Sequence, residues 1–271
     1  MADICILFDL SRQSYYKYKK RYERRQIKEE IILDLVRRVR KRQPMIGGKK
    51  LYYLLKADIE KLGGGIGRDK LFSILKENHL LISRRRKYIR TTDSNHSYNV
   101  YKNLIKEIDI THLEPKQLLV SDLTYLRTRN RFYYLSIVTD VGSRKIVGYC
   151  LSDTLSLDGS LAALKTSLRG ISDYSGLIHH SDRGIQYCSN AYIAYLKRKE
   201  IKISMSGKGN PYENAIAERV IGILKREFLL DCTFPCYSVM QKSVKQSIEI
   251  YNKERPHMSI GMLTPTQRYA A

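Results

Sequence analysis

Three acidic residues stand where carboxylates could carry out metal-dependent chemistry. Asp122 lies in the apolar stretch LLVSDLTYL, Asp182 follows the run LIHH, and Glu218 lies within NAIAERVIGILKREF. A carboxylate in apolar surroundings is costly unless it is paired or bound to a metal. Carboxylate oxygens suit Mg²⁺, and two ions about 3.5–4 Å apart can activate an attacking oxygen and stabilise a leaving one. Spacing alone also allows three ordinary salt bridges.

The segments around these residues predict the elements that must position them. From Gln117 the apolar residues alternate with period two, which indicates strands, and short turns join the first three strands as hairpins. Helices and strands then alternate along the chain. The expected strands are QLLVSDLTYLRT, RFYYLSIVTDV, KIVGYCLSD, GLIHH and IKISMS, and the expected helices cover 157–169, 190–200, 212–230 and 238–253.

This order predicts an α/β fold in which a mixed sheet is flanked by helices. Asp122 would lie within the first strand, Asp182 just past the end of the fourth, and Glu218 on the long helix. Ligand sites in open sheets gather at such strand ends. The predicted fold therefore gives the three carboxylates a common meeting place.

The first 90 residues have a helical pattern. Ser11 could cap a helix through SYYKYKKRYERR, a second helix would run over 27–42, and two more would follow on either side of the glycines at 63–65. The cluster Arg84, Arg85, Arg86 and Lys87 comes directly after them. We expect a helix-turn-helix type of DNA-binding region, and a plain helical bundle with a solvated basic face is the alternative.

Charge supports a polyanionic partner. The chain has 49 Lys and Arg against 27 Asp and Glu, a net charge of +22. Residues 1–90 hold 25 of the basic and 10 of the acidic residues. Such a surplus repels itself in a compact fold, and nucleic acid is the commonest polyanion to offset it. A generally basic ribosome-associated or chromatin-like protein is the other reading of charge alone.

Cysteine usage and hydropathy bear on the compartment. The five cysteines are an odd number at scattered positions, so we expect reduced thiols; Cys232 and Cys236 could form half of a zinc site but have no second pair nearby. No apolar run is long enough to span a bilayer, and the N-terminus lacks the basic start of a signal peptide. We expect a bacterial cytoplasmic protein, nucleoid-associated when it is bound to DNA, with no membrane partner.

Four motifs occur in order along the chain: SDLTYL, HHSDRGIQYCS, SMSGKGNPYENAIAERVIGILKRE and YNKERPHMSIGMLTP. Together they closely resemble the second-reading-frame transposases of the insertion-sequence-three family, which contain a retroviral-integrase-like core. The 35 residues between Asp182 and Glu218 match the separation typical of that family. RQSYYK and GRDKLFSILKENHLLISRRRKY resemble its helical N-terminal region, so the resemblance covers nearly the whole chain.

The resemblance implies a ribonuclease-H-like core and magnesium-dependent strand cleavage and strand transfer at the ends of the protein's own insertion sequence. Asp122, Asp182 and Glu218 match the catalytic, metal-binding triad for two Mg²⁺ ions, with Mn²⁺ as a substitute. Lys225, two helical turns after Glu218, matches a residue that contacts transposon-end DNA. The chain has no Trp before the first motif, and Pro211 stands where Cys is common. These departures leave the end preference open.

Other residues near the triad are weaker candidates. Lys208 lies in the polar loop GKGNP and is a candidate DNA contact, since loops beside active sites commonly touch substrates. His180 and Asn214 are candidates to support the triad from behind, and His179 and His180 could equally be packed neutral histidines. Glu213 lies about 140° around the helix from Glu218, so it is not expected to be a ligand.

The resulting organisation has four parts: a DNA-binding region at 1–90, a linker at 91–116, a catalytic core at 117–230, and a C-terminal helix and tail at 231–271. The resemblance implies double-stranded DNA partners, both element ends and target, a homo-oligomer, and an upstream-reading-frame product that can be joined by a frameshift fusion. A non-catalytic repressor and a simple ribonuclease are the rival readings. Intact triad carboxylates argue against the first, and the basic N-terminal region argues against the second.

Overall fold

A computed structural model of the chain describes residues 11–63, 65–83, 99–106, 108–110, 112–207 and 214–271. The chain divides into two compact units, Met1–Arg84 and Arg85–Ala271. Each unit has its own buried apolar core. Among the described residues, no helix combines the length and the apolar character needed to cross a bilayer.

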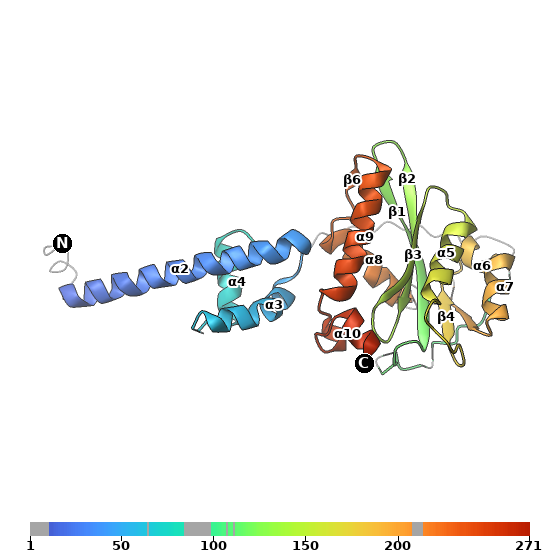
Figure 1. Cartoon of the computed structure of the whole chain (residues 1–271), viewed down its shortest axis with the longest axis horizontal. Coiled ribbons are helices and arrows are strands. Elements are labelled where there is room, and N and C mark those ends of the chain that lie inside the picture. The colour runs from blue at the N-terminus through green and yellow to red at the C-terminus, as the bar shows by residue number, and fades with distance from the viewer. Residues whose placement is uncertain (1–10, 64, 84–98, 107, 111, 208–213) are drawn as a thin grey trace. The chain divides into compact units, whose positions relative to one another are not determined.

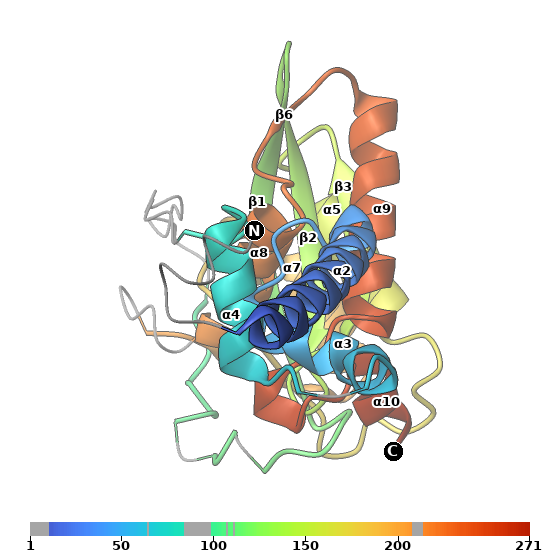
Figure 2. The ribbon, with the colours of Figure 1, turned by 90° about the vertical axis from the view of Figure 1, so that its left-hand side faces the viewer.

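The first unit is helical (Figure 2). It consists of α2 (Arg12–Arg42), α3 (Gly48–Lys61) and α4 (Arg68–Glu77). The expected break near residue 27 is absent, because no Gly or Pro interrupts the sequence between Arg12 and Arg42 and the helix continues. The expected cap is confirmed: Ser14 N donates to Ser11 Oγ at 3.0 Å.

The core of this unit lies between the C-terminal half of α2 and the other two helices. It is built from Ile32 and Val36 of α2 with apolar residues of α3 and α4 that recur at helical spacing. Gly48 lies against the Phe72 ring, and a Cβ there would come within 2.6 Å of it. The helices α3 and α4 therefore pack closely where α3 begins.

The second unit contains a mixed sheet with the strand order β3-β2-β1-β4-β5, and β6 pairs with β1. The first three strands are antiparallel neighbours, whereas β4, β5 and β6 join in parallel. This is the ribonuclease-H-like arrangement expected from the sequence. The strands are β1 (Leu118–Thr128), β2 (Phe132–Asp140), β3 (Ile146–Ser152), β4 (Ile178–Ser181), β5 (Lys202–Met205) and β6 (Thr233–Phe234).

Helices cover both faces of the sheet (Figure 1). One face carries α5 (Leu157–Ser167), α6 (Ile185–Cys188) and α7 (Asn190–Arg198), and the other carries α8 (Ala215–Glu227) and α9 (Tyr237–Lys253). Gly148 of β3 allows α5 to approach, because a Cβ there would lie 2.1 Å from the Ala163 carbonyl oxygen. The two layers hold β1 at the centre of the unit.

The segment after α8 contains further elements of the second unit. Thr233 and Phe234 of β6 pair with Arg127 and Thr128, and η2 (Met258–Ile260) and α10 (Pro265–Ala270) follow α9. The sequence did not predict β6, because a two-residue strand has no detectable period, and α10 was not predicted either. Apolar residues of α9 pack into the same core as α8, so this segment belongs to the second unit.

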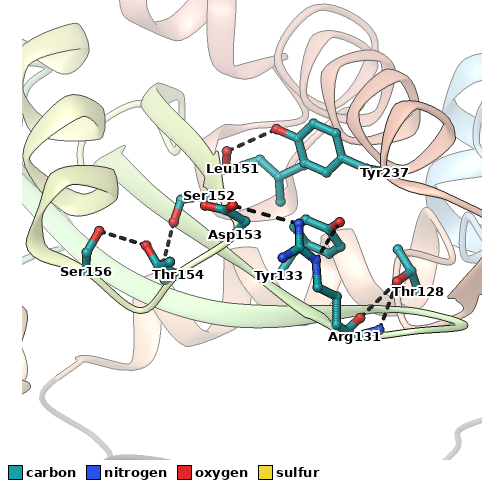
Figure 3. Close-up of polar contacts among 9 residues, drawn as sticks. All are labelled: Thr128, Arg131, Tyr133, Leu151, Ser152, Asp153, Thr154, Ser156 and Tyr237. Carbon is teal, nitrogen blue, oxygen red and sulfur yellow. Dashed lines mark hydrogen bonds and ion pairs between the residues drawn. The ribbon is translucent and has the colours of Figure 1, made fainter.

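A polar cluster fastens the tip of the β1–β2 hairpin (Figure 3). Arg131 Nε donates to the Tyr133 hydroxyl at 2.9 Å, and Arg131 Nη2 lies 3.8 Å from Asp153. Thr128 Oγ1 donates to the Arg131 carbonyl oxygen at 3.0 Å. The Tyr133 ring also packs 4.8 Å from the ring of Tyr237, between centroids. The hairpin is thereby tied to β3 and to the start of α9.

Candidate active site

Asp122 and Asp182 are brought together by strand register. The parallel pairing of β1 with β4 ends at the pair Ser121 and Ser181. Asp122 is the next residue of β1, and Asp182 is the first residue after β4. Neighbouring strands lie about 4.8 Å apart, so the two acidic residues emerge side by side. Both are half-buried.

The sheet edge opens where Asp122 lies. On one side β1 continues beside β2, but on the other side its pairing with β4 stops at Ser121 and its pairing with β6 begins only at Arg127. At this opening, the Leu123 N–H of β1 donates to Asp122 Oδ1 at 2.8 Å. Asp182 Oδ1 accepts from Gly184 N at 2.9 Å. Each carboxylate is thus oriented by a backbone N–H of its own loop or strand.

Glu218 reaches this opening from α8. The helix packs on the sheet through a buried row that includes Ala217, Val220 and Leu224. Ala217 lies in the same apolar cluster as Val120, two residues before Asp122. Asn214, which caps α8, donates from Nδ2 to the Ser121 carbonyl oxygen at 3.4 Å. The first turn of α8 is therefore held against β1, and Glu218 is exposed on that turn.

The three carboxylates influence one another electrostatically. Burial, and then the Asp182 and Glu218 carboxylates, raise the pKa of Asp122 well above its usual value; the Leu123 N–H and Lys225 act in the opposite direction. Burial and then Asp182 also raise the pKa of Glu218. Each of the three pairs among these residues therefore interacts across the opening. Adjacent like charges disfavour ionisation unless a cation joins them.

The three carboxylates lie near one another but do not form a chelating site. Within the described part of the chain, no group of three His, Cys, Asp or Glu side chains is arranged tightly enough to hold one ion. Three carboxylates without a cation repel one another, which favours their separation. The exposed Glu218 on a first helical turn is the member with the most room to do so.

Lys225 lies two turns along α8 from Glu218. Its Nζ lies 5.2 Å from the centroid of the Tyr125 ring and 4.0 Å from Asp231 Oδ1. Burial lowers the pKa of Lys225, and Asp231 and then Asp122 oppose that effect. The lysine therefore stands between the acidic site and the outer part of β1, on the same helix face as Glu218.

The two histidines before Asp182 point into separate buried networks. His179 Nε2 lies 2.7 Å from Ser121 Oγ and 3.0 Å from the Tyr192 hydroxyl. Burial, and then His180, lower the pKa of His179 to about 3, so His179 is neutral at physiological pH. His180 Nδ1 lies 2.8 Å from Ser204 Oγ, and Ser204 also accepts from the Leu104 N–H at 2.9 Å. His179 is thus a packed neutral histidine that braces the Ser121 side of β1.

Sequence reasoning missed Tyr187 of α6. Its side chain is 1% exposed, and its hydroxyl lies beside the Gln186 side chain but forms no hydrogen bond of good geometry within the described part of the chain. Burial, and then Asp122, Tyr192 and Asp182, raise the pKa of Tyr187 well above its usual value. A buried hydroxyl beside two carboxylates is a polar group of the site. Its position five residues after Asp182 in HHSDRGIQYCS was the available signal.

The C-terminal motif YNKERPH makes contacts that stabilise the second unit. Arg255 is 1% exposed and forms two hydrogen bonds with Glu227, the last residue of α8, at 2.7 and 2.8 Å. Asn252 binds both the N–H and the carbonyl oxygen of Ile146 in β3, at 3.0 and 2.9 Å. Tyr251 donates to the Arg144 carbonyl oxygen at 2.8 Å. The motif therefore fastens α8 and the sheet to the C-terminal segment.

Several sequence candidates lie outside the described residues. These are Lys208, Glu213 and the cluster Arg84, Arg85, Arg86 and Lys87. Cys232 and Cys236 are free and exposed on either side of β6. No metal-holding group forms around them among the residues that the structure covers.

Comparisons with known proteins agree with this geometry. The integrase core domain family matches residues 103–211, and a second integrase core domain family matches residues 199–265. The chain is 34% identical over 266 residues to the "Insertion element IS600 uncharacterized 31 kDa protein" of Shigella sonnei, covering 97% of this chain and 96% of that protein. It is 34% identical over 194 residues to "Transposase InsF for insertion sequence IS3A" of Escherichia coli (strain K12), covering 71% of this chain and 67% of that protein.

Among solved structures, the HTLV-2 integrase catalytic core domain in its trimeric form matches with a TM-score of 0.46 and 18% identity, covering 58% of this chain and 98% of that chain. The two relatives resemble this chain over most of their length, and the integrase core families span the sheet and α8. The chain therefore belongs to the IS3 family of DDE-type transposases with an integrase core.

Proposed function

We propose that Asp122, Asp182 and Glu218 hold two Mg²⁺ ions, with Mn²⁺ as a substitute, and that the chain cuts and joins DNA strands at the ends of its own insertion sequence. The observation that supports this most directly is the register of β1 and β4. It places two carboxylates side by side at an open sheet edge, next to the first turn of the helix that carries the third.

The donor set fits divalent magnesium. All three side chains offer carboxylate oxygens, which hard cations prefer to nitrogen or sulfur. Burial and then the neighbouring carboxylates raise the pKa values of Asp122 and Glu218, and a dication would offset both effects. When bound, paired ions supply Lewis-acid stabilisation of the attacking and leaving oxygens of a phosphodiester.

The protein's own residues would orient the reacting groups. Backbone N–H groups of Leu123 and Gly184 fix one oxygen of each aspartate and leave the others free for ligation. Asn214 keeps the first turn of α8 beside β1, so that Glu218 need move only locally to complete the site. Lys225 would contact the phosphate backbone of the element end that lies across the opening.

DNA contacts outside the described residues remain part of the proposal. In the sequence, Lys208 lies between β5 and α8, and the basic cluster Arg84 to Lys87 lies where the first unit ends and the second begins. We assign them to phosphate contacts on sequence grounds. The homo-oligomer, the target duplex and the upstream-frame partner are proposed on the same grounds, since two element ends must be held together.

The decisive variant is Glu218→Gln, which keeps size and polarity but removes the charge. Changes behind metal ligands already cost about 10–100-fold, so loss of a direct ligand should lower Mg²⁺-dependent nicking of an element-end duplex by more than about 100-fold. Glu249→Gln is the matched control, because Glu249 is an exposed glutamate of α9 paired with Lys253. Undiminished nicking by Glu218→Gln would reject the assignment.

A second arm separates the transposase from a plain nuclease or a repressor. Strand transfer should be measured with a pre-cut element end that carries a free 3′-hydroxyl and a separate target duplex. A transposase joins the two, and the joining is lost in Glu218→Gln. Hydrolysis of any duplex without joining would identify a nuclease, and tight end binding with neither reaction would identify a repressor.

A further inference from the structure

The N-terminal half of α2 extends beyond the core of its own unit (Figure 1). We call residues Arg12–Ile27 the α2 arm. No side chain of the arm is buried in the described part of the chain, whereas Ile32, Leu33 and Val36 farther along the same helix are. Helices of this length are marginal in water without packing. The arm therefore lacks the packing that stabilises the rest of α2.

The charge of the arm is concentrated and almost entirely positive. Residues 12–25 contain seven Lys or Arg and a single acidic residue, Glu23. Lys17, Lys20, Arg21 and Arg24 fall within an arc of about 100° at 100° per residue, and we call these four the basic face. None of the four forms an ion pair with a described residue. Glu23 lies on a different side of the helix, 4.0 Å from Lys19.

The spacing within the basic face works against an isolated helix. Lys17 and Arg21 are four residues apart, as are Lys20 and Arg24. Like charges at this spacing lie next to one another on the helix surface and destabilise it. The same row of cations becomes favourable when it faces a polyanion, because each contact with a phosphate releases condensed counterions.

A second face of the arm carries tyrosines. Tyr15, Tyr18 and Tyr22 lie on the side that farther along holds Ile32 and Val36 in the core. The rings of Tyr18 and Tyr22 stack at 6.2 Å between centroids. This pairing supports the helix and leaves the basic face free to be presented to a partner.

We propose that the basic face of the α2 arm docks on the phosphate backbone of duplex DNA, independently of base sequence, and becomes a stable helix when it does so. The chemistry favours DNA over a second copy of this chain, because two arms of the same positive charge would repel each other along this face. The proposal takes DNA as substrate from the proposed function and adds a contact surface on residues of the helical unit.

The test measures binding of the full-length chain to a random-sequence duplex at several salt concentrations, without divalent metal so that no cutting occurs. Lys20→Gln/Arg24→Gln removes two cations of the basic face. Each phosphate contact contributes about 0.9 to the slope of log K against log salt. The slope should therefore become less steep by about 1.8, and binding at low salt should weaken correspondingly.

Lys242→Gln/Lys245→Gln is the matched control, since it removes two exposed cations from one face of α9. It should leave the slope within about 0.5 of the wild-type value. An unchanged slope in Lys20→Gln/Arg24→Gln would overturn the proposal. So would a change of oligomeric state in that variant with DNA binding intact, because the arm would then be a contact between copies of the chain.

Hydrogen exchange in the wild-type chain provides a readout that needs no variant. Backbone amides of the arm should exchange fast in the free protein and markedly slower with the random duplex, while those around Val36 change little. Unaltered exchange in the arm on saturating DNA would also overturn the proposal. A negative result for the α2 arm does not affect the Glu218→Gln nicking test, so the arm proposal and the proposed function are tested separately.

Discussion

Ser121 and Ser181 face one another as the last pair of the parallel ladder between β1 and β4, and each is followed directly by an aspartate. This relationship turns a separation of 60 positions along the sequence into adjacency at a sheet edge. It also explains why Asp122 is strained electrostatically, since burial and the neighbouring Asp182 both oppose its ionisation. This register therefore supports the proposal that cations complete the site.

Asp122→Asn should make the metal-free protein more stable at neutral pH. The folded pKa of Asp122 lies above its unfolded value, so the folded state binds more protons between the two and its stability falls as pH rises through that window. The advantage of the asparagine variant should vanish below about pH 3, under the unfolded pKa of 3.8, where both states of the wild type are protonated. Thermal unfolding against pH measures this.

Magnesium should reverse the order of stability of the wild type and Asp122→Asn. Added Mg²⁺ should raise the melting temperature of the wild type by mass action and leave that of Asp122→Asn nearly unchanged. Asp173→Asn is a control in an exposed loop, where the carboxylate accepts only from Ser175 N. An equal Mg²⁺-induced shift in Asp122→Asn would contradict a metal-binding role for Asp122.

Asn214→Ala should weaken the response to metal without unfolding the protein. Its amide joins the first turn of α8 to the Ser121 carbonyl oxygen, so the loss frees Glu218 to move away from the aspartates. Supporting residues of this kind change metal affinity by about 10–100-fold. Nicking measured across a Mg²⁺ titration should show a higher half-saturating concentration with partial recovery at saturation. Asn190→Ala, at an exposed helix start, should not shift it.

Tyr187→Phe should separate stability from activity. The tyrosine hydroxyl is buried without a hydrogen bond of good geometry among described residues, and such a group costs about 1–3 kcal/mol. Phenylalanine keeps the ring packing with Tyr192 and removes that cost, so the metal-free protein should gain about 1 kcal/mol or more. Strand cleavage should fall if the hydroxyl binds a carboxylate or substrate oxygen in the working site. A variant that is neither more stable nor less active would contradict this reading.

The sequence indicated the strands and the helices of the catalytic unit because their periodicity is local. Asp122 could be placed in a strand and Asp182 past a strand end from residue pattern alone. The register that joins Ser121 to Ser181 could not be read, because parallel pairing is a contact between distant segments with no local signal. The resemblance to a family implied Asp122, Asp182 and Glu218 as the catalytic triad, and that assignment stays a prediction.

Other features could not be predicted from the sequence for related reasons. The break expected near Ile27 was wrong. The apolar pattern changes near this residue because the buried part of α2 begins just after it, whereas the helix itself is continuous. The pairing of Arg255 with Glu227 links a tail motif to the end of α8, and nothing in either segment identifies the other. Long-range partners of this kind depend on the assembled core.

Glu227→Gln should destabilise the second unit strongly. It leaves Arg255, which is 1% exposed, without its carboxylate partner, and breaking a buried pair costs about 3–5 kcal/mol. Replacing both residues by apolar ones, as in Glu227→Met/Arg255→Leu, should recover most of this loss. Urea unfolding measures both. A double variant as unstable as the single one would show that the contact between Arg255 and His257, 2.8 Å apart, matters more than the ion pair.

His179 should make the fold sensitive to acid. Its folded pKa of about 3 lies below the ordinary value of 6.5, so its contribution is fully present above pH 6.5 and is lost as pH falls toward 3. Uptake of one proton on unfolding corresponds to about 1.4 kcal/mol per pH unit in that window. His179→Gln, which keeps hydrogen-bonding capacity beside Ser121 and Tyr192, should flatten the slope by that amount in urea unfolding. The window runs from about pH 4 to about pH 5.5, about one unit inside each of the two pKa values. An unchanged slope would mean that His179 is already protonated in the folded protein, and the neutral network behind Asp122 would have to be redrawn.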